Sequence, residues 1–222
     1  MTGRGAIVFD FDGVLADTEP LHLAAFQDAF GRRGWTLDAA AYFDRYLGFE
    51  DRDLVRAFAI DARLALAPGD EDALIAAKAR AYEGRLAQRS VLFPGAPAAI
   101  RRLSLHFHLA IASGSVRAEI DAALGSAGLA PAFQVIVGAD DVARSKPAPD
   151  LYLTAIAQLG VPASRAVAIE DSRWGLASAR AAGLRTIAVT TSYPAATLAS
   201  ADVVVGSLDE IAVDLVARLL AE

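Results

Sequence analysis

Six short apolar runs recur along the chain, and stretches with helical periodicity separate most of them. The runs cover residues 6–10, 108–113, 134–137, 166–170, 185–189 and 202–205. Strands that alternate with helices favour a parallel sheet, because each parallel connection needs a crossover, which a helix provides. The pattern therefore predicts an α/β fold with a parallel sheet flanked by helices.

The interval between the first two runs breaks this rhythm, since it holds helical patterns and no convincing strand. Helices are expected at about 19–33, 50–60 and 70–88, with a turn near 38–46. Thr18 is a suitable N-cap for the first helix, and Pro20 suits its opening turn. We therefore expect an all-helical cap domain at 17–90, inserted into a core formed by 1–16 and 91–222.

Composition narrows the range of partners. The 222-residue chain has no cysteine and a formal net charge of −6, so it forms neither disulfides nor a thiolate metal site. A net negative chain offers no electrostatic footprint for nucleic acid. No apolar run reaches the length of a membrane span, and the first residues lack the long apolar stretch of a signal peptide. We expect a cytoplasmic, monomeric protein with a small-molecule ligand and no nucleic-acid or membrane partner.

The first apolar run leads into two carboxylates. The stretch "AIVFDFDG" places Asp10 at a strand end and Asp12 two residues later. Ligands of parallel α/β sheets bind beyond the carboxyl ends of the strands. Residues i and i+2 of a strand point the same way, although Gly13 indicates that the chain already turns at Asp12. Two neighbouring anions repel each other unless a cation is present, and magnesium is the usual hard cation beside phosphate.

Other predicted strand ends supply complementary groups. Ser113 and Gly114 follow the second run and offer a hydroxyl and a backbone amide for phosphate oxygens. Lys146 precedes "PAPD", and Glu170 and Asp171 form a second acidic pair at the end of the fourth run. Carboxylates for a cation, a lysine for an anion and a hydroxyl are the groups that phosphoryl transfer uses.

Four ordered motifs at these strand ends resemble those of the haloacid dehalogenase superfamily of phosphatases and phosphomutases. They read "DFDGVLADTE", "IASGS", "SKPAPD" and "EDSRWGLASARAAG". The resemblance covers nearly the whole chain and is closest to the β-phosphoglucomutase-like branch. It implies a Rossmann-like core with a helical cap, and a magnesium-dependent phosphatase that acts on a small phosphorylated metabolite such as a sugar phosphate.

The resemblance also implies a role for each motif residue. Asp10 would be the nucleophile that becomes phosphorylated, and Asp12 the general acid for the leaving group and then the base for water. Ser113 and Lys146 would hold the transferring phosphoryl group. The implied magnesium ligands are Asp10, the backbone carbonyl of Asp12, Asp171, and Glu170 directly or through water.

Lysine is scarce in this chain. Of the 21 basic residues only Lys78 and Lys146 are lysines. Codon bias is one explanation, and a need for a compact ammonium at these positions is the other. The resemblance implies that Lys78 contacts the substrate from the cap. The substrate contacts expected with it are Gly13, Thr18, His22, Gly48 and Gly114.

One segment departs from the β-phosphoglucomutase pattern. Those mutases carry a lysine and an arginine around a segment that aligns with "YLGFEDRDL", and here Leu47 and Asp51 occupy the two positions. The departure favours a phosphatase over a sugar phosphomutase, which is the alternative within enzymes. A non-catalytic phosphate-binding or sensor protein is the alternative of another class, although such a module would be expected to lack part of the motif set.

Overall fold

The computed structural model describes residues 4–86 and 91–221. The chain divides into two compact units, one made of Met1–Asp17 with Ser90–Glu222 and the other of Thr18–Arg89. The first holds the sheet and is termed the core. Among its described residues the second contains helices and turns but no strand, and it is termed the helical unit. The second junction between the units lies outside the described residues.

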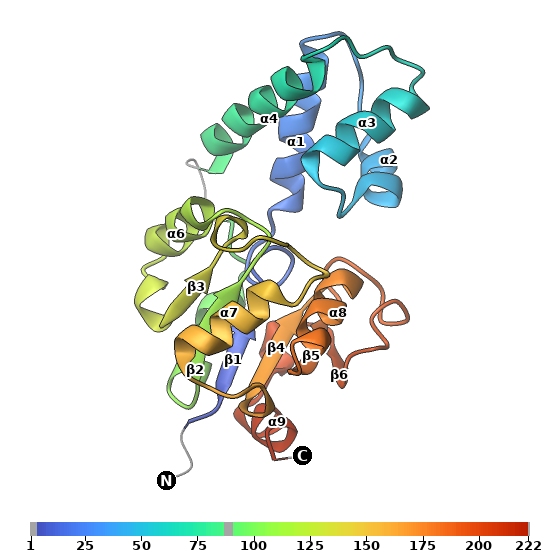
Figure 1. Ribbon diagram of the computed structural model, residues 1–222. Coiled ribbons are helices and arrows are strands. Elements are labelled where there is room, and N and C mark those ends of the chain that lie inside the picture. Colours follow the sequence, from blue (N-terminus) through green and yellow to red (C-terminus); the bar gives the residue numbers. More distant parts are fainter. Residues whose placement is uncertain (1–3, 87–90, 222) are drawn as a thin grey trace. The chain divides into compact units, whose positions relative to one another are not determined.

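The core is built on a parallel sheet. Among the described residues it has six strands in the order β3-β2-β1-β4-β5-β6, and every neighbouring pair runs parallel (Figure 1). The strands are β1 (Ala6–Phe9), β2 (His108–Ala112), β3 (Val135–Val137), β4 (Ala166–Glu170), β5 (Arg185–Val189) and β6 (Val203–Val205). Each predicted apolar run contains one strand, so the predicted fold class is confirmed.

Helices cover the sheet, and β1 lies at its centre. The core helices are α5 (Ala96–Ser104), α6 (Arg117–Ser126), α7 (Asp150–Leu159), α8 (Arg173–Ala181) and α9 (Val213–Leu219). Helix α7 crosses in front of the sheet in Figure 1. Ala6 and Val8 of β1 belong to a buried cluster with apolar residues of α7 and α8. All four residues of β1 are completely buried, which explains why its sequence is apolar throughout instead of alternating.

The strand order reverses beside β1, with β2 and β3 on one side and β4 to β6 on the other. Ala6 accordingly pairs with His108 of β2 and with Ala166 of β4. Such a reversal is a topological switch point, where ligands of open α/β sheets bind beyond the carboxyl ends of the strands. Asp10 follows β1 and Glu170 ends β4, so two of the predicted acidic positions lie at the switch point.

The helical unit has its own hydrophobic cluster. Its elements are α1 (Glu19–Gly31), α2 (Ala39–Ala41), a π-helical turn (Tyr42–Tyr46), α3 (Asp51–Asp61) and α4 (Asp70–Leu86). The helices expected at 19–33 and 50–60 are present, and the end of the one expected at 70–88 lies outside the described residues. Leu23, Phe26 and Phe30 of α1 are buried in the cluster. No helix in the described part of either unit combines the length and apolar character that a membrane crossing requires.

Thr18 directly precedes α1, but its side chain does not cap the helix, so that prediction is wrong. A capping residue normally has an extended backbone, which directs its side-chain oxygen at the first turn. The φ of −92° and ψ of −19° at Thr18 are already helical, and its carbonyl oxygen accepts hydrogen bonds from the amides of Leu21 and His22. Pro20 lies in the first turn, as expected.

Candidate active site

Three carboxylates meet at the switch point. Asp10 follows β1, Glu170 is the last residue of β4, and Asp171 comes next. Each offers one oxygen atom, and these atoms lie within 4.8 Å of one another. The strand register brings them together, because Phe9 pairs with Ile169 and the residues that follow both emerge at the same edge. All three carboxylates are buried, so water screens their mutual repulsion only weakly.

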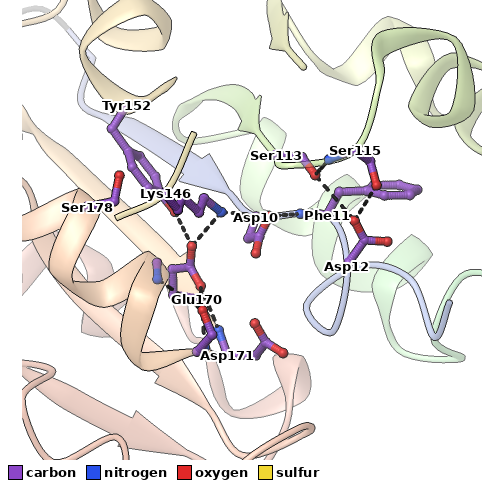
Figure 2. Close-up of polar contacts among 12 residues, drawn as sticks. Asp10, Phe11, Asp12, Ser113, Ser115, Lys146, Tyr152, Glu170, Asp171 and Ser178 are labelled. Carbon is purple, nitrogen blue, oxygen red and sulfur yellow. Dashed lines mark hydrogen bonds and ion pairs between the residues drawn. The ribbon is translucent and has the colours of Figure 1, made fainter. Parts of the chain in front are cut away.

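Lys146 lies between two of these carboxylates (Figure 2). Its Nζ is 2.8 Å from Asp10 Oδ1 and 2.6 Å from Glu170 Oε1, and its side chain is only 10% exposed. Burial acts to lower the pKa of the Lys146 ammonium, but the two carboxylates outweigh it and raise this pKa above its ordinary value. The Ser178 hydroxyl donates to the carbonyl of Ala148 at 2.6 Å, which ties the loop that carries Lys146 to α8. The ammonium is therefore permanently charged and fixed in place.

Hydrogen-bond donors hold both oxygens of Glu170. Besides the lysine, Oε1 accepts from the hydroxyl of Tyr152 at 2.7 Å. Oε2 accepts from the amide of Asp171 at 3.1 Å and from the hydroxyl of Ser172 at 3.2 Å. Ser172 is also the N-cap of α8 and accepts from the amide of Gly175. One hydroxyl therefore both starts the helix and orients the carboxylate.

The acidic cluster carries more negative charge than Lys146 balances. Burial raises the pKa of Asp10, repulsion from Glu170 adds to this effect, and Lys146 opposes it. Burial and then Glu170 raise the pKa of Asp171 to about 7. A bound divalent cation would relieve this repulsion, and carboxylate oxygens without nitrogen or sulfur ligands suit a hard ion such as magnesium. The side chains of three of the four predicted ligands, Asp10, Glu170 and Asp171, thus form a cluster that is compatible with the predicted metal.

Gly13 lies where the turn after β1 approaches Asp171. Its φ is +73°, in the left-handed region that glycine adopts without strain. A Cβ at this position would lie 1.9 Å from Asp171 Oδ2 and 2.7 Å from the hydroxyl oxygen of Ser192. The Thr191 hydroxyl also donates to the carbonyl of Gly13. Glycine is therefore required here for the close approach, and its contact with substrate stays a prediction.

The structure separates the two aspartates that the sequence places together (Figure 2). Asp12 Oδ2 accepts hydrogen bonds from the hydroxyl of Ser115 at 2.5 Å and from that of Ser113 at 3.4 Å. Asp10 instead faces Lys146, and the Asp12 side chain is outside the acidic cluster found among the described residues. One carboxylate faces a positive charge and the other faces neutral hydroxyls, so the two have different chemical surroundings.

Gly175 in α8 leaves room for the Glu170 carboxylate. A Cβ there would lie 1.8 Å from Glu170 Oε1, so an alanine must displace either the carboxylate or the helix. We expect Gly175→Ala to destabilise the protein by about 1–3 kcal/mol and to weaken cation binding. Gly125→Ala in α6 is the matched control: no other group lies within 4 Å of the new Cβ, and the change should stabilise by about 0.5–1 kcal/mol. Thermal unfolding of both variants tests this, and equal melting temperatures would contradict the steric argument.

The helical unit contains a buried ion pair. Lys78 Nζ donates to the two carboxylate oxygens of Asp51 at 2.8 and 2.9 Å, and its side chain is 7% exposed. The ammonium lies over the rings of Phe26 and Tyr82, and His22 stacks on Tyr82 with 4.4 Å between ring centroids. Both lysines of this chain are therefore ion-paired and largely removed from solvent.

The other predicted contact residues have differing environments. Gly48 has a φ of +81° and lies in an exposed turn before α3, whereas Thr18 is completely buried. Gly114 belongs to the unit that holds the sheet, follows Ser113 directly and is exposed to solvent. The contacts of these residues with substrate, like those of His22 and Lys78, stay predictions.

Three residues that hold the site were missed in the sequence. Ser172 has a recognisable signal, because a serine that opens a helix directly after an acidic pair is a typical N-cap. Ser115 ends the stretch "SGS". Residues two apart in an extended chain point the same way, so Ser115 could be expected to place a second hydroxyl beside that of Ser113. Tyr152 gives no such signal, since its ring belongs to the apolar face of α7 and only the packing of that helix brings its hydroxyl to Glu170.

The chain matches known proteins over most of its length. The model of the haloacid dehalogenase-like hydrolases matches residues 7–189. Protein CbbY of Rhodobacter capsulatus is 41% identical over 85% of this chain and 86% of the relative. Fructose-1-phosphate phosphatase YqaB of Escherichia coli K12 is 31% identical over 82% of this chain and 95% of the relative. A crystal structure of a CbbY variant from Rhodobacter sphaeroides in complex with xylulose-(1,5)bisphosphate has a TM-score of 0.81 and 31% identity, covering 94% of this chain and 96% of that one.

The acidic cluster and the buried lysine at the switch point of a parallel sheet form a site of the kind that phosphoryl transfer uses. The matches show which family the chain belongs to. The chain belongs to the haloacid dehalogenase-like hydrolases. All four motifs lie inside the matched residues, and the resemblance read from them is confirmed. The predicted enzyme class, a hydrolase of phosphoric monoesters, is confirmed by the family model and by these relatives.

Proposed function

We propose that this chain is a magnesium-dependent phosphatase that hydrolyses a small sugar phosphate through an aspartyl phosphate on Asp10. The observation that carries the proposal is the buried ammonium of Lys146, 2.8 Å from Asp10 Oδ1, beside the carboxylates of Glu170 and Asp171. Asp10 thus has a fixed positive charge for phosphoryl oxygens and further carboxylate ligands for a cation close by. Phosphoryl transfer depends mainly on such positioning and charge stabilisation.

The proposed reaction has two steps. First, a carboxylate oxygen of Asp10 attacks phosphorus, the bond from phosphorus to the ester oxygen breaks, and Asp12 gives its proton to that oxygen. The sugar leaves as a neutral alcohol. Second, a water molecule attacks the phosphorus of the aspartyl phosphate while Asp12 takes a proton from the water. The bond from Asp10 to phosphorus then breaks, which releases phosphate and restores both aspartates.

Several groups hold the phosphoryl group and the metal in this proposal. The magnesium ligands would be Asp10, Glu170, Asp171 and the backbone carbonyl of Asp12. When bound, the ion supplies positive charge that reduces the repulsion between phosphate and the attacking carboxylate. Lys146 supplies a second positive charge, and the Ser113 hydroxyl supplies a neutral donor.

Two observations support a sugar phosphatase over a sugar phosphomutase. One is the name of a relative 31% identical to this chain, a fructose-1-phosphate phosphatase. In the helical unit, Asp51 binds Lys78 through both carboxylate oxygens and so neutralises its charge. A mutase has to bind a second phosphate, and a neutralised lysine with a carboxylate in the position of an arginine is poorly suited to that task.

Phosphate release from fructose 1-phosphate and a hexose 1-phosphate tests the proposal. We expect release that needs magnesium, stops when EDTA is added, and resumes when magnesium is restored in excess. No bisphosphate activator should be needed. Conversion of the hexose 1-phosphate to the 6-phosphate with little free phosphate would assign the mutase reaction instead. Absence of turnover with every phosphate ester, p-nitrophenyl phosphate included, would favour the non-catalytic alternative.

A further inference from the structure

Ser115 contacts Asp12 but has no part in the reaction as described so far. Its hydroxyl donates to Asp12 Oδ2 at 2.5 Å, closer than the 3.4 Å contact of Ser113 with the same oxygen. We propose that Ser115 is a positioning residue, which determines the oxygen of Asp12 that carries the proton for the leaving group. This inference rests on the proposed function, in which Asp12 is the general acid.

The hydrogen bonds around the two serines give the direction of each donor. The Ser113 hydroxyl oxygen accepts from the amide of Ser115 at 3.0 Å, which leaves its single hydrogen for Asp12. Ser115 directs its own hydroxyl hydrogen at the same oxygen of Asp12. A carboxyl oxygen that accepts two such bonds is the unprotonated one, since a proton on it would displace a donor. The inferred role therefore puts the proton on Oδ1 when Asp12 acts as the general acid.

The serine pair is fixed to the sheet independently of the turn that carries Asp12. The amide of Ser113 donates to the carbonyl of Val137 at 3.0 Å, and the carbonyl of Ser115 accepts from the amide of Ala139 at 2.9 Å. Both anchors belong to the end of β3 or the turn after it. The bond from Ser115 to Asp12 therefore joins two separately anchored segments and restricts rotation of the carboxyl group.

A leaving-group comparison tests this role, because a general acid matters most for a poor leaving group. A sugar alkoxide needs a proton in order to leave, whereas p-nitrophenolate is stable without one. The ratio kcat/KM reports the steps up to phosphorylation of Asp10. We expect Ser115→Ala to lower kcat/KM for a sugar phosphate by at least about tenfold, and for p-nitrophenyl phosphate by about threefold at most.

Three comparisons complete the experiment. Ser115→Thr keeps the hydroxyl and should recover most of the activity on the sugar phosphate. Ser126→Ala is the matched control, because that hydroxyl donates to the carbonyl of Ala123 in its own helix, and it should change neither substrate. In an Asp12→Asn background, Ser115→Ala should cause little further loss, since the carboxamide delivers no acidic proton.

The outcomes separate this inference from the proposed function. Equal losses of kcat/KM for both substrates, or no loss for either, would overturn the role of Ser115 while the phosphatase assignment stands. Absence of magnesium-dependent phosphate release by the unsubstituted protein would overturn the assignment itself. Turnover of p-nitrophenyl phosphate reports whether the Ser115→Ala variant is folded. If that variant does not fold, Ser115→Cys takes its place in the same comparison, because cysteine has a similar shape and is a weaker hydrogen-bond donor.

Discussion

We expect Asp10→Asn to lower kcat for phosphate release by at least about 10⁴-fold, as loss of a catalytic nucleophile does in other hydrolases. The carboxamide has nearly the shape of the carboxylate but forms no acyl phosphate. Acid quenching after a burst of labelled substrate should trap a phosphoenzyme in the unsubstituted protein and none in the variant. Near-normal turnover, or a phosphoenzyme in Asp10→Asn, would remove Asp10 from the proposed role.

The same substitution should stabilise the metal-free protein, which separates lost chemistry from lost folding. Burial raises the pKa of Asp10 above its value in the unfolded chain. Between these two values the folded state binds more protons than the unfolded state, so stability falls as pH rises through that interval. Asparagine carries no charge and removes this loss, while Lys146 keeps its partner Glu170 at 2.6 Å. A lower melting temperature for the variant at neutral pH would contradict the charge argument.

The sheet could be predicted because a buried strand has a recognisable sequence, a short run of apolar residues. A strand covered on both faces has to be apolar throughout, as β1 is, and its end is marked by the first charged residue, Asp10. Helix capping cannot be read from residue type in the same way, since it depends on the backbone angles of the capping residue. Thr18 before Pro20 has the composition of an N-cap, yet its backbone angles are helical and its side chain makes no capping hydrogen bond.

The site was predictable to the extent that strand ends converge. Asp10 and Glu170 end neighbouring parallel strands, so their proximity follows from topology alone. The partners of these residues depend on finer geometry that the sequence does not determine. The packing of α7 brings the Tyr152 hydroxyl to Glu170, and the Asp12 side chain lies outside the acidic cluster and accepts a hydrogen bond from Ser115.

Whether the two lysine positions need a compact ammonium stays a prediction. Both lysines are largely buried and ion-paired with carboxylates. An arginine has a larger, planar head group, so its contacts with the same carboxylates would differ in geometry from those of a compact ammonium. Lys146 Nζ lies 2.8 Å from Asp10 and 2.6 Å from Glu170, so a guanidinium could not reproduce both contacts from the same single atom.

We expect Lys146→Met to lower kcat by about 10²–10³-fold, the usual result of removing one oriented charge contact to the transition state. It should also destabilise the metal-free protein by about 3–5 kcal/mol, because it leaves Asp10 and Glu170 buried without their cation. Lys146→Arg should restore the charge but not the geometry. Its kcat should therefore stay well below that of the unsubstituted protein.

Magnesium and a double substitution test the electrostatic origin of these effects. Magnesium should recover part of the melting temperature of Lys146→Met, since a bound cation takes over some of the compensation that Lys146 supplied. Adding Asp10→Asn to Lys146→Met removes the second charge of the pair, so it should stabilise Lys146→Met by more than it stabilises the unsubstituted protein, although the double variant is inactive. Strictly additive stability changes would mean that Lys146 acts through packing and not through charge. Full activity in Lys146→Arg would mean that any cation at this position suffices, and that the compact ammonium has no special role.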